Sequence, residues 1–173
     1  MFLNLVIFIC LALFGCSDPR SEREKLRDLT LNQLAKEMQK KNLYAVGSGG
    51  GCTRDKKINL ISIVFHYKQV LSIETARKLM VESADTLLTL INSNPSSKEY
   101  FEVFPPPVDV ICICITGITP SPENASEIRG ILLIKGKLYY NVEDKSPLPR
   151  PGPVLMVHEE TYEEAKNILS NEH

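Results

Sequence analysis

The sequence contains no tryptophan, and its six tyrosines and six phenylalanines are scattered along the chain. Lysine and arginine number 20 and aspartate and glutamate 21, so the formal net charge is −1. A chain with neither a basic excess nor an aromatic stacking platform lacks the two features that hold nucleic acid. We therefore expect no nucleic-acid binding and no charge-driven attraction to an anionic membrane.

Metal ligands are also few. The chain has only three histidines, at positions 66, 158 and 173. The stretch HEETYEE, which begins at His158, lacks the second histidine four residues on that a zincin helix uses. The sequence therefore assigns no catalytic residue, and we expect neither a metal centre nor a cofactor.

The length and composition of the chain are sufficient for one folded domain. The chain has 173 residues, of which 43% are hydrophobic and 24% charged, as is typical of a single globular domain with one core. No internal repeat interrupts this composition. We expect one domain.

An apolar run occupies residues 1–15 and stops at Cys16, after which the chain turns polar with SDPRSEREK. The run is too short to span a bilayer, which needs about 20 residues, but it suits the apolar region of a signal peptide. The end of the run, LFGC, resembles the lipobox of bacterial lipoproteins. An ordinary secretory signal or an uncleaved anchor is the alternative, and a buried N-terminal element is disfavoured because neither alternation nor a polar helical face is visible.

The lipobox resemblance implies cleavage after Gly15, a diacylglyceryl thioether on Cys16 and acylation of the new amine. Together with the composition and patterning of the rest of the chain, it leads us to expect a signal peptide at 1–15, lipid attachment and a tether at 16–29, and a single α+β domain at 30–173. The anchor places the protein in the bacterial cell envelope. Ser17 favours the outer membrane by resemblance to enterobacterial sorting, because an aspartate at this position often retains lipoproteins on the inner membrane.

Hydrophobic periodicity predicts three helices. Thr30 and Gln33 have capping-box spacing, and Ser72 is a plausible N-cap for a long amphipathic helix. The glycine run GSGGG at 47–51 indicates a flexible turn that ends the first helix. The predicted helices cover residues 31–41, with a start as early as Glu22 as the alternative, 73–91, and about 159–169.

Strands are predicted where apolar residues alternate or run continuously. The stretch VDVICICITG is apolar on both faces, so we place it in the centre of the sheet. Lys135 and Gly136 mark the turn of a hairpin. The remaining predicted segments are a strand at 58–67, a short helical turn before the prolines at 105–107, the hairpin at 129–142, a Pro-rich loop at 143–153 and a short strand at 154–157.

This order predicts an α+β fold with a mainly antiparallel sheet of four to five strands and helices packed on one face. The segments SGGG, ISIVFHY, LSIETARKLMVE and HEETYEEA together resemble a family of small bacterial proteins of unassigned function. The resemblance covers most of the mature chain and implies no catalytic residues.

Three thiols remain after Cys16 is modified and residues 1–15 are removed. Cys112 and Cys114 share one face of a strand about 6.6 Å apart, near the limit for a disulfide, and we expect both to be small buried apolar residues. Cys52, beside the glycine run, is the candidate exposed and reactive thiol.

Two histidines are candidate polar site residues. His66 is expected on the less apolar face of its strand, and His158 at a strand-to-helix junction. A cluster of Cys52, His66 and His158 is one arrangement for an active site, although no spacing in the sequence places the three together. A cleft that gathers Cys52 with a histidine and a carboxylate would favour such a site.

Two functions follow. The first is a non-enzymatic envelope lipoprotein, anchored in the membrane by its lipid, that binds an envelope protein through its sheet, its Pro-rich loop or an edge strand. The alternative is a small envelope enzyme or ligand binder that uses the glycine run with Cys52 and a histidine. We favour the first, because no convincing catalytic constellation is visible.

Overall fold

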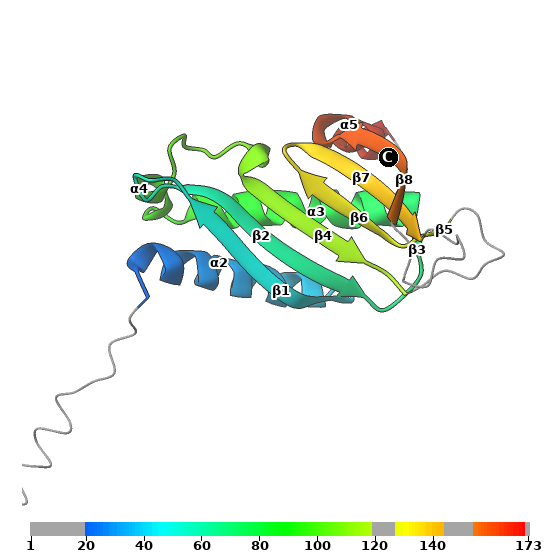
Figure 1. Ribbon diagram of the computed structural model, residues 1–173, viewed down its shortest axis with the longest axis horizontal. Helices are drawn as coiled ribbons and strands as arrows, with labels where there is room; N and C mark the ends of the chain where they lie inside the picture. Colours follow the sequence, from blue (N-terminus) through cyan, green and yellow to red (C-terminus); the bar gives the residue numbers. More distant parts are fainter. Residues whose placement is uncertain (1–19, 119–126, 144–153, 172–173) are drawn as a thin grey trace, which may run out of the picture.

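A computed structural model describes residues 20–118, 127–143 and 154–171. Its main feature is a six-stranded sheet with the strand order β1-β2-β4-β6-β7-β8 (Figure 1). The α+β class is confirmed, and the sheet has six strands where four to five were expected. The strands are β1 (Leu43–Cys52), β2 (Ile58–Tyr67), β4 (Ile111–Thr116), β6 (Gly130–Ile134), β7 (Lys137–Glu143) and β8 (Val154–Thr161).

The sheet is antiparallel except at its second pair, where β2 and β4 run parallel. A parallel pair needs a long crossover, which α3 (Ile73–Ser93) and the short α4 (Ser97–Tyr100) provide. From β4 onwards each strand pairs with the next long strand by antiparallel contacts. A two-stranded ribbon of β3 (Leu71–Ser72) and β5 (Glu127–Ile128) lies beside the large sheet.

Three helices cover one face of the sheet. In Figure 1 the sheet faces the viewer, and α2 (Glu22–Gln39), α3 and α5 (Tyr162–Asn171) lie behind it or along its borders. The amphipathic stripe of α3 packs its buried residues into this layer, as its periodicity predicts. The core consists of aliphatic and aromatic side chains from both layers, among them Leu34, Met38, Phe65, Met80, Leu87, Ile113, Leu133 and Tyr140.

We call the face that is turned away from the helices the outer face. In β2 and β4 the inward side chains are buried, whereas those of Ser62, Cys112 and Cys114 are half-buried and that of Val64 is exposed. The register aligns Val64 with Cys114, and Cys114 with Leu132 of β6. No described segment packs over this face.

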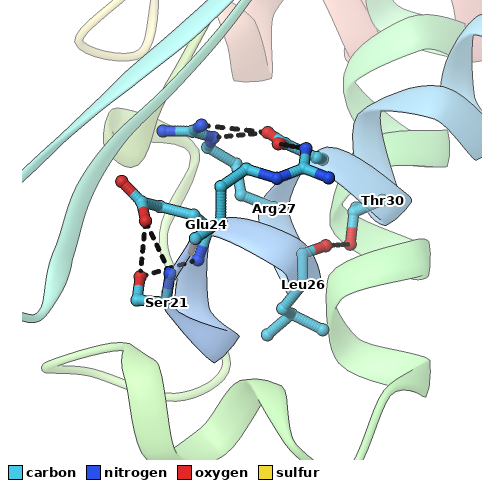
Figure 2. Close-up of polar contacts among 7 residues, drawn as sticks. Ser21, Glu24, Leu26, Arg27 and Thr30 are labelled. Atoms are coloured by element: carbon cyan, nitrogen blue, oxygen red, sulfur yellow. Dashed lines mark hydrogen bonds and ion pairs between the residues drawn. The ribbon is translucent and has the colours of Figure 1, made fainter. Parts of the chain in front are cut away.

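The first helix begins at Glu22, which was the alternative start, so residues 22–29 are helical. Ser21 is its N-cap, and a capping box joins Ser21 to Glu24 (Figure 2). The Ser21 main-chain N–H donates to Glu24 Oε2 at 2.8 Å, and the Glu24 N–H donates to Ser21 Oγ at 3.3 Å. Thr30, the expected cap, instead donates its hydroxyl to the Leu26 carbonyl inside the helix at 2.9 Å.

The glycine run is a strand, not a flexible turn, because β1 forms an antiparallel ladder with β2 along the whole run. Gly50 explains why glycine is used here. A Cβ at this position would lie 2.7 Å from the carbonyl oxygen of Leu60 and 3.1 Å from Cδ of Arg27. The absence of side chains therefore lets α2 lie close against the edge of the sheet.

The hairpin of β6 and β7 turns at Lys135 and Gly136 as predicted, and both residues have positive φ, 49° and 70°. Such angles at both central positions suit the right-handed twist of a two-residue hairpin. Strand β8 is longer than expected and continues to Thr161, so α5 begins at Tyr162 instead of Glu159. The Pro-rich loop lies outside the described residues, apart from Glu143.

Candidate functional site

The structure does not bring the predicted thiol and histidines together. Cys52 ends β1 beside Ile58, at one end of the β1–β2 hairpin, and is an exposed free thiol as expected. His66 is paired with Tyr44 at the other end. Eight residue steps of β2 separate Ile58 from His66, or about 26 Å at 3.3 Å per residue. Cys16 lies outside the described residues.

His66 lies on the outer face, as its alternation predicts. Its ring nitrogen Nδ1 is 3.5 Å from the Thr116 hydroxyl on the adjacent strand, and that hydroxyl donates to the Phe65 carbonyl at 3.3 Å. His66 is thus part of a small polar contact between β2 and β4. Four strand spacings of about 4.8 Å separate β2 from β8, which carries the second histidine.

His158 lies within β8, not at the strand-to-helix junction, because the strand continues for three more residues. The register places it opposite Tyr140, and the two rings are 5.1 Å apart between centroids. Tyr140 is fully buried on the helix side, so His158 lies on the opposite side of the sheet from His66. Its Nε2 is 3.7 Å from Oε2 of Glu160.

A buried polar cluster lies under β8, and the sequence did not predict it. Arg77 of α3 donates from Nε to Oε1 of Glu160 at 2.8 Å, and the Tyr140 hydroxyl donates to the same oxygen. Burial, and then this hydrogen bond, raise the pKa of Tyr140 above its ordinary value. Oε2 of Glu160 is buried and has no hydrogen-bond partner in the described part of the chain. The cluster fastens α3, β7 and β8 together.

One signal could have revealed part of this cluster. Arg77 stands four residues after Ile73 and three before Met80, within the apolar stripe of α3. A charged residue in such a stripe is buried and therefore needs a partner. Its partner is 83 positions away, and local periodicity carries no information about it.

The two central thiols are half-buried on the outer face, not fully buried as expected. Each is next to small or aliphatic side chains of the neighbouring strands, and neither forms a disulfide. Burial raises the pKa of Cys112, and burial together with the nearby Cys112 raises that of Cys114. Both are therefore neutral thiols at pH 7, which suits a structural role and not a nucleophile.

Strand β8 ends the sheet and exposes consecutive apolar side chains. The exposed fractions of Leu155, Met156 and Val157 are 49%, 56% and 52%. No described strand pairs with the outer edge of β8. An edge with unpaired N–H and C=O groups and apolar side chains can pair with another chain. We call Leu155–Val157 the apolar edge.

A groove of about 550 Å³ lies at the opposite end of the molecule, where α2 begins. Its lining comes from three segments that polar contacts tie together. Arg23 donates from Nη1 to the Lys56 carbonyl at 2.7 Å, and Lys57 donates from Nζ to the Glu99 carbonyl at 2.5 Å. The lining residues are 21–24, 55–57, Glu99 and Tyr100.

Among the described residues, no group of three or more histidine, cysteine, aspartate or glutamate side chains is arranged to hold a metal ion. Within residues 20–118, 127–143 and 154–171, no helix is long and apolar enough to cross a membrane. Comparison with family models, with curated proteins and with solved structures found no match.

Proposed function

We propose that this protein is a lipid-anchored protein of the bacterial cell envelope whose α+β domain binds another protein through the edge of β8. The observation that carries the proposal is the apolar edge, because it combines an unpaired strand border with three exposed apolar side chains. A partner that adds an extended strand there would satisfy the free main-chain groups and cover the apolar side chains in one step.

The chemistry of β8 defines the partner segment. Its second half is engaged within the chain, since Glu159 pairs with Lys137 at 2.7 Å and Glu160 is held by Arg77. Only the first half is left to bind, and it is apolar. The partner is therefore an extended segment with aliphatic or aromatic side chains at alternate positions.

The other border of the sheet is less suited to this role. Strand β1 is also an edge, but its central residues are glycines, which offer no side chains for recognition. Helix α2 also lies against this strand, since a Cβ on Gly50 would lie only 3.1 Å from Cδ of Arg27. Recognition through alternate side chains thus favours β8.

The anchor is part of the same proposal. Cys16 carries a diacylglyceryl group and an N-acyl chain, and two or more chains hold a protein stably at a membrane. The intact mass of the mature protein is expected to equal residues 16–173 plus acyl groups, and Cys16→Ser is expected to leave an unmodified, uncut precursor. A mature chain that starts elsewhere contradicts the anchor. Ser17 supports the outer membrane as the location.

Binding through β8 is tested by placing a photoreactive amino acid at Val157 in the cell that makes the protein. The matched control position is Leu29 of α2, another apolar residue, with an exposed fraction of 67%. We expect one discrete adduct from position 157, none from position 29, and loss of the adduct when Met156→Lys is added, because a lysine on an edge strand opposes pairing.

Three results contradict this mode of binding. They are equal adducts from both positions, an adduct that survives Met156→Lys, and an adduct of twice the mass of the chain, which identifies a second copy as the occupant. Because Met156 is exposed, the substitution is expected to change the free energy of unfolding by no more than about 0.5 kcal/mol. Urea unfolding of the variant checks this.

A further inference from the structure

We infer that the domain stands with one defined end against a lipid surface of zwitterionic headgroups. This anchor-proximal end consists of Ser21, the turn Thr53–Lys57 and α4, and in Figure 1 it is the end marked by the start of α2 and by α4. The inference rests on the proposed lipid at Cys16. It assigns a second interaction surface, separate from the apolar edge.

The length of chain between the lipid and the domain carries the argument. Cys16 and Ser21 are separated by five residue steps, and a fully extended chain spans about 3.5 Å per step, so Ser21 lies within about 18 Å of the lipid-bearing cysteine. Strand β2, with ten residues, is about 30 Å long by the same kind of estimate. The tether is thus shorter than the domain, and it cannot lift this end far from the membrane.

The exit point of the tether is fixed to the rest of the domain. The capping box begins the helix at once after Ser21, and Arg23 joins the helix to the turn through the Lys56 carbonyl. Lys57 joins the same turn to α4 through the Glu99 carbonyl. These contacts fix the first turn of α2, the turn Thr53–Lys57 and α4 to one another. A short tether therefore limits the distance of the whole anchor-proximal end from the membrane, and not only that of the first turn of α2.

The charges of this end match zwitterionic headgroups. Together with the first turn of α2, its exposed side chains include three basic and three acidic groups, namely Arg54, Lys56 and Lys98 and Glu22, Asp55 and Glu99. The groove between the segments is lined by both signs, so it offers partners to a phosphate and to an ammonium group alike. A surface with balanced charge gains nothing from anionic lipid, and the orientation is therefore expected to be independent of anionic lipid and of salt.

The apolar edge lies at the other end of the sheet. Met156 is opposite Asn141, and the same cross-strand row continues through Gly130 and Thr116 to His66. This row is about 26 Å along β2 from Ile58, which borders the anchor-proximal turn. In this orientation the apolar edge lies away from the lipid headgroups, where it is accessible to a protein partner.

The test compares two fluorophores on the full lipidated chain in phosphatidylethanolamine–phosphatidylcholine vesicles that contain nitroxide-labelled headgroups. One fluorophore is on the native Cys52 at the anchor-proximal end. The other is on Val70→Cys, in the β2–β3 turn at the far end, with Cys52→Ser. Both chains carry Cys112→Ser and Cys114→Ser so that only one thiol reacts, and the absence of tryptophan removes intrinsic indole emission.

We expect the Cys52 fluorophore to be quenched at least threefold more than the fluorophore at position 70, with no change on adding anionic lipid. Insertion of twelve Gly/Ser residues before Arg20 is expected to reduce the quenching at Cys52. Equal quenching at both positions, as for a domain that lies flat, or stronger quenching at position 70 overturns the inference while the anchor stands. A mass without acyl groups at Cys16 overturns the anchor and this inference together.

Discussion

Arg77 and Glu160 lie 83 positions apart in the sequence, and the guanidinium Nε of Arg77 donates to Oε1 of Glu160 at 2.8 Å inside the protein. Both side chains are almost fully buried, and the Tyr140 hydroxyl donates to the same oxygen. This contact connects the crossover helix α3 to the edge strand β8. It is the polar link by which the last strand is fixed to the helix layer.

Loss of this buried pair is expected to destabilise the fold strongly. Arg77→Met leaves a buried carboxylate without its cation, and such a change costs about 3–5 kcal/mol. The matched control is Lys41→Met, which removes an ion pair with Glu82 that is partly open to solvent and is worth about 0–1 kcal/mol. Urea unfolding of both variants measures the difference, and equal losses would show that the Arg77 pair is not buried in solution.

The glycine run gives a second matched comparison. Gly50→Ala places a Cβ 2.7 Å from a main-chain oxygen, and such overpacking costs about 1–3 kcal/mol. Gly47→Ala places its Cβ at an ordinary 3.9 Å from Val64 Cβ, so its cost is expected to be below about 1 kcal/mol. Thermal unfolding of the two variants measures the difference in their destabilisation. If both are tolerated alike, β1 does not pair closely with β2 at Gly50.

Thiol labelling is expected to separate the cysteines. Cys52 is exposed, whereas burial raises the pKa of Cys112 and Cys114 above the ordinary value of 9.0. The thiolate is the reactive form, so maleimide is expected to label Cys52 first at pH 7. The labelling rate of the two central thiols is expected to keep rising with pH to values above pH 9. Peptide mass spectrometry after brief treatment follows each site. Early labelling of Cys114 contradicts its half-buried position.

The first turn of α2 is expected to weaken in acid. Hydrogen bonds from the Ser21 main chain and hydroxyl lower the pKa of Glu24 below 4.5. The folded state therefore holds this proton less tightly than the unfolded state, and the stabilisation is complete above pH 4.5 and is lost as pH falls through the lower folded value.

Glu24→Gln tests this capping contribution. The variant is expected to differ from the parent in urea unfolding near pH 6 and to approach it near pH 3. Glu22→Gln, which removes an exposed pair with Lys25 and leaves the cap intact, serves as the control. A difference between Glu24→Gln and the parent that stays constant from pH 6 to pH 3 means that the carboxylate charge does not contribute to the cap.

Local pattern was enough to predict some elements and not others. Ser72 and the stripe of α3 were predicted because amphipathic periodicity over five turns has few alternative explanations. The turn at Lys135 and Gly136 was predicted because a glycine lies between two apolar runs, and glycine adopts positive φ readily. Glycine has low strand propensity, and pairing with β2 overrode it in β1.

The candidate site was less predictable than the fold. The sequence predicted an exposed Cys52 and placed His66 on the less apolar face of its strand. It did not predict that the glycine run pairs with β2, which puts the two residues at opposite ends of the hairpin. The sequence predicted a strand at 154–157, but the exposure of its apolar side chains depends on which strand ends the sheet, a property of the assembled topology. A short apolar run has the same sequence pattern whether the strand lies at the edge or in the centre of a sheet.

The parallel pair of β2 and β4 has a consequence for the order of folding. The other neighbouring strands of the large sheet pair antiparallel with the next or a nearby strand in the sequence, whereas β2 and β4 meet only after the chain has closed a long loop through α3. Loop closure is slow when the contacts are distant in sequence, so the hairpin β1–β2 and the meander β4–β8 are expected to behave as two separate cooperative units. The line between β2 and β4 is then the place where the two units of the sheet join last.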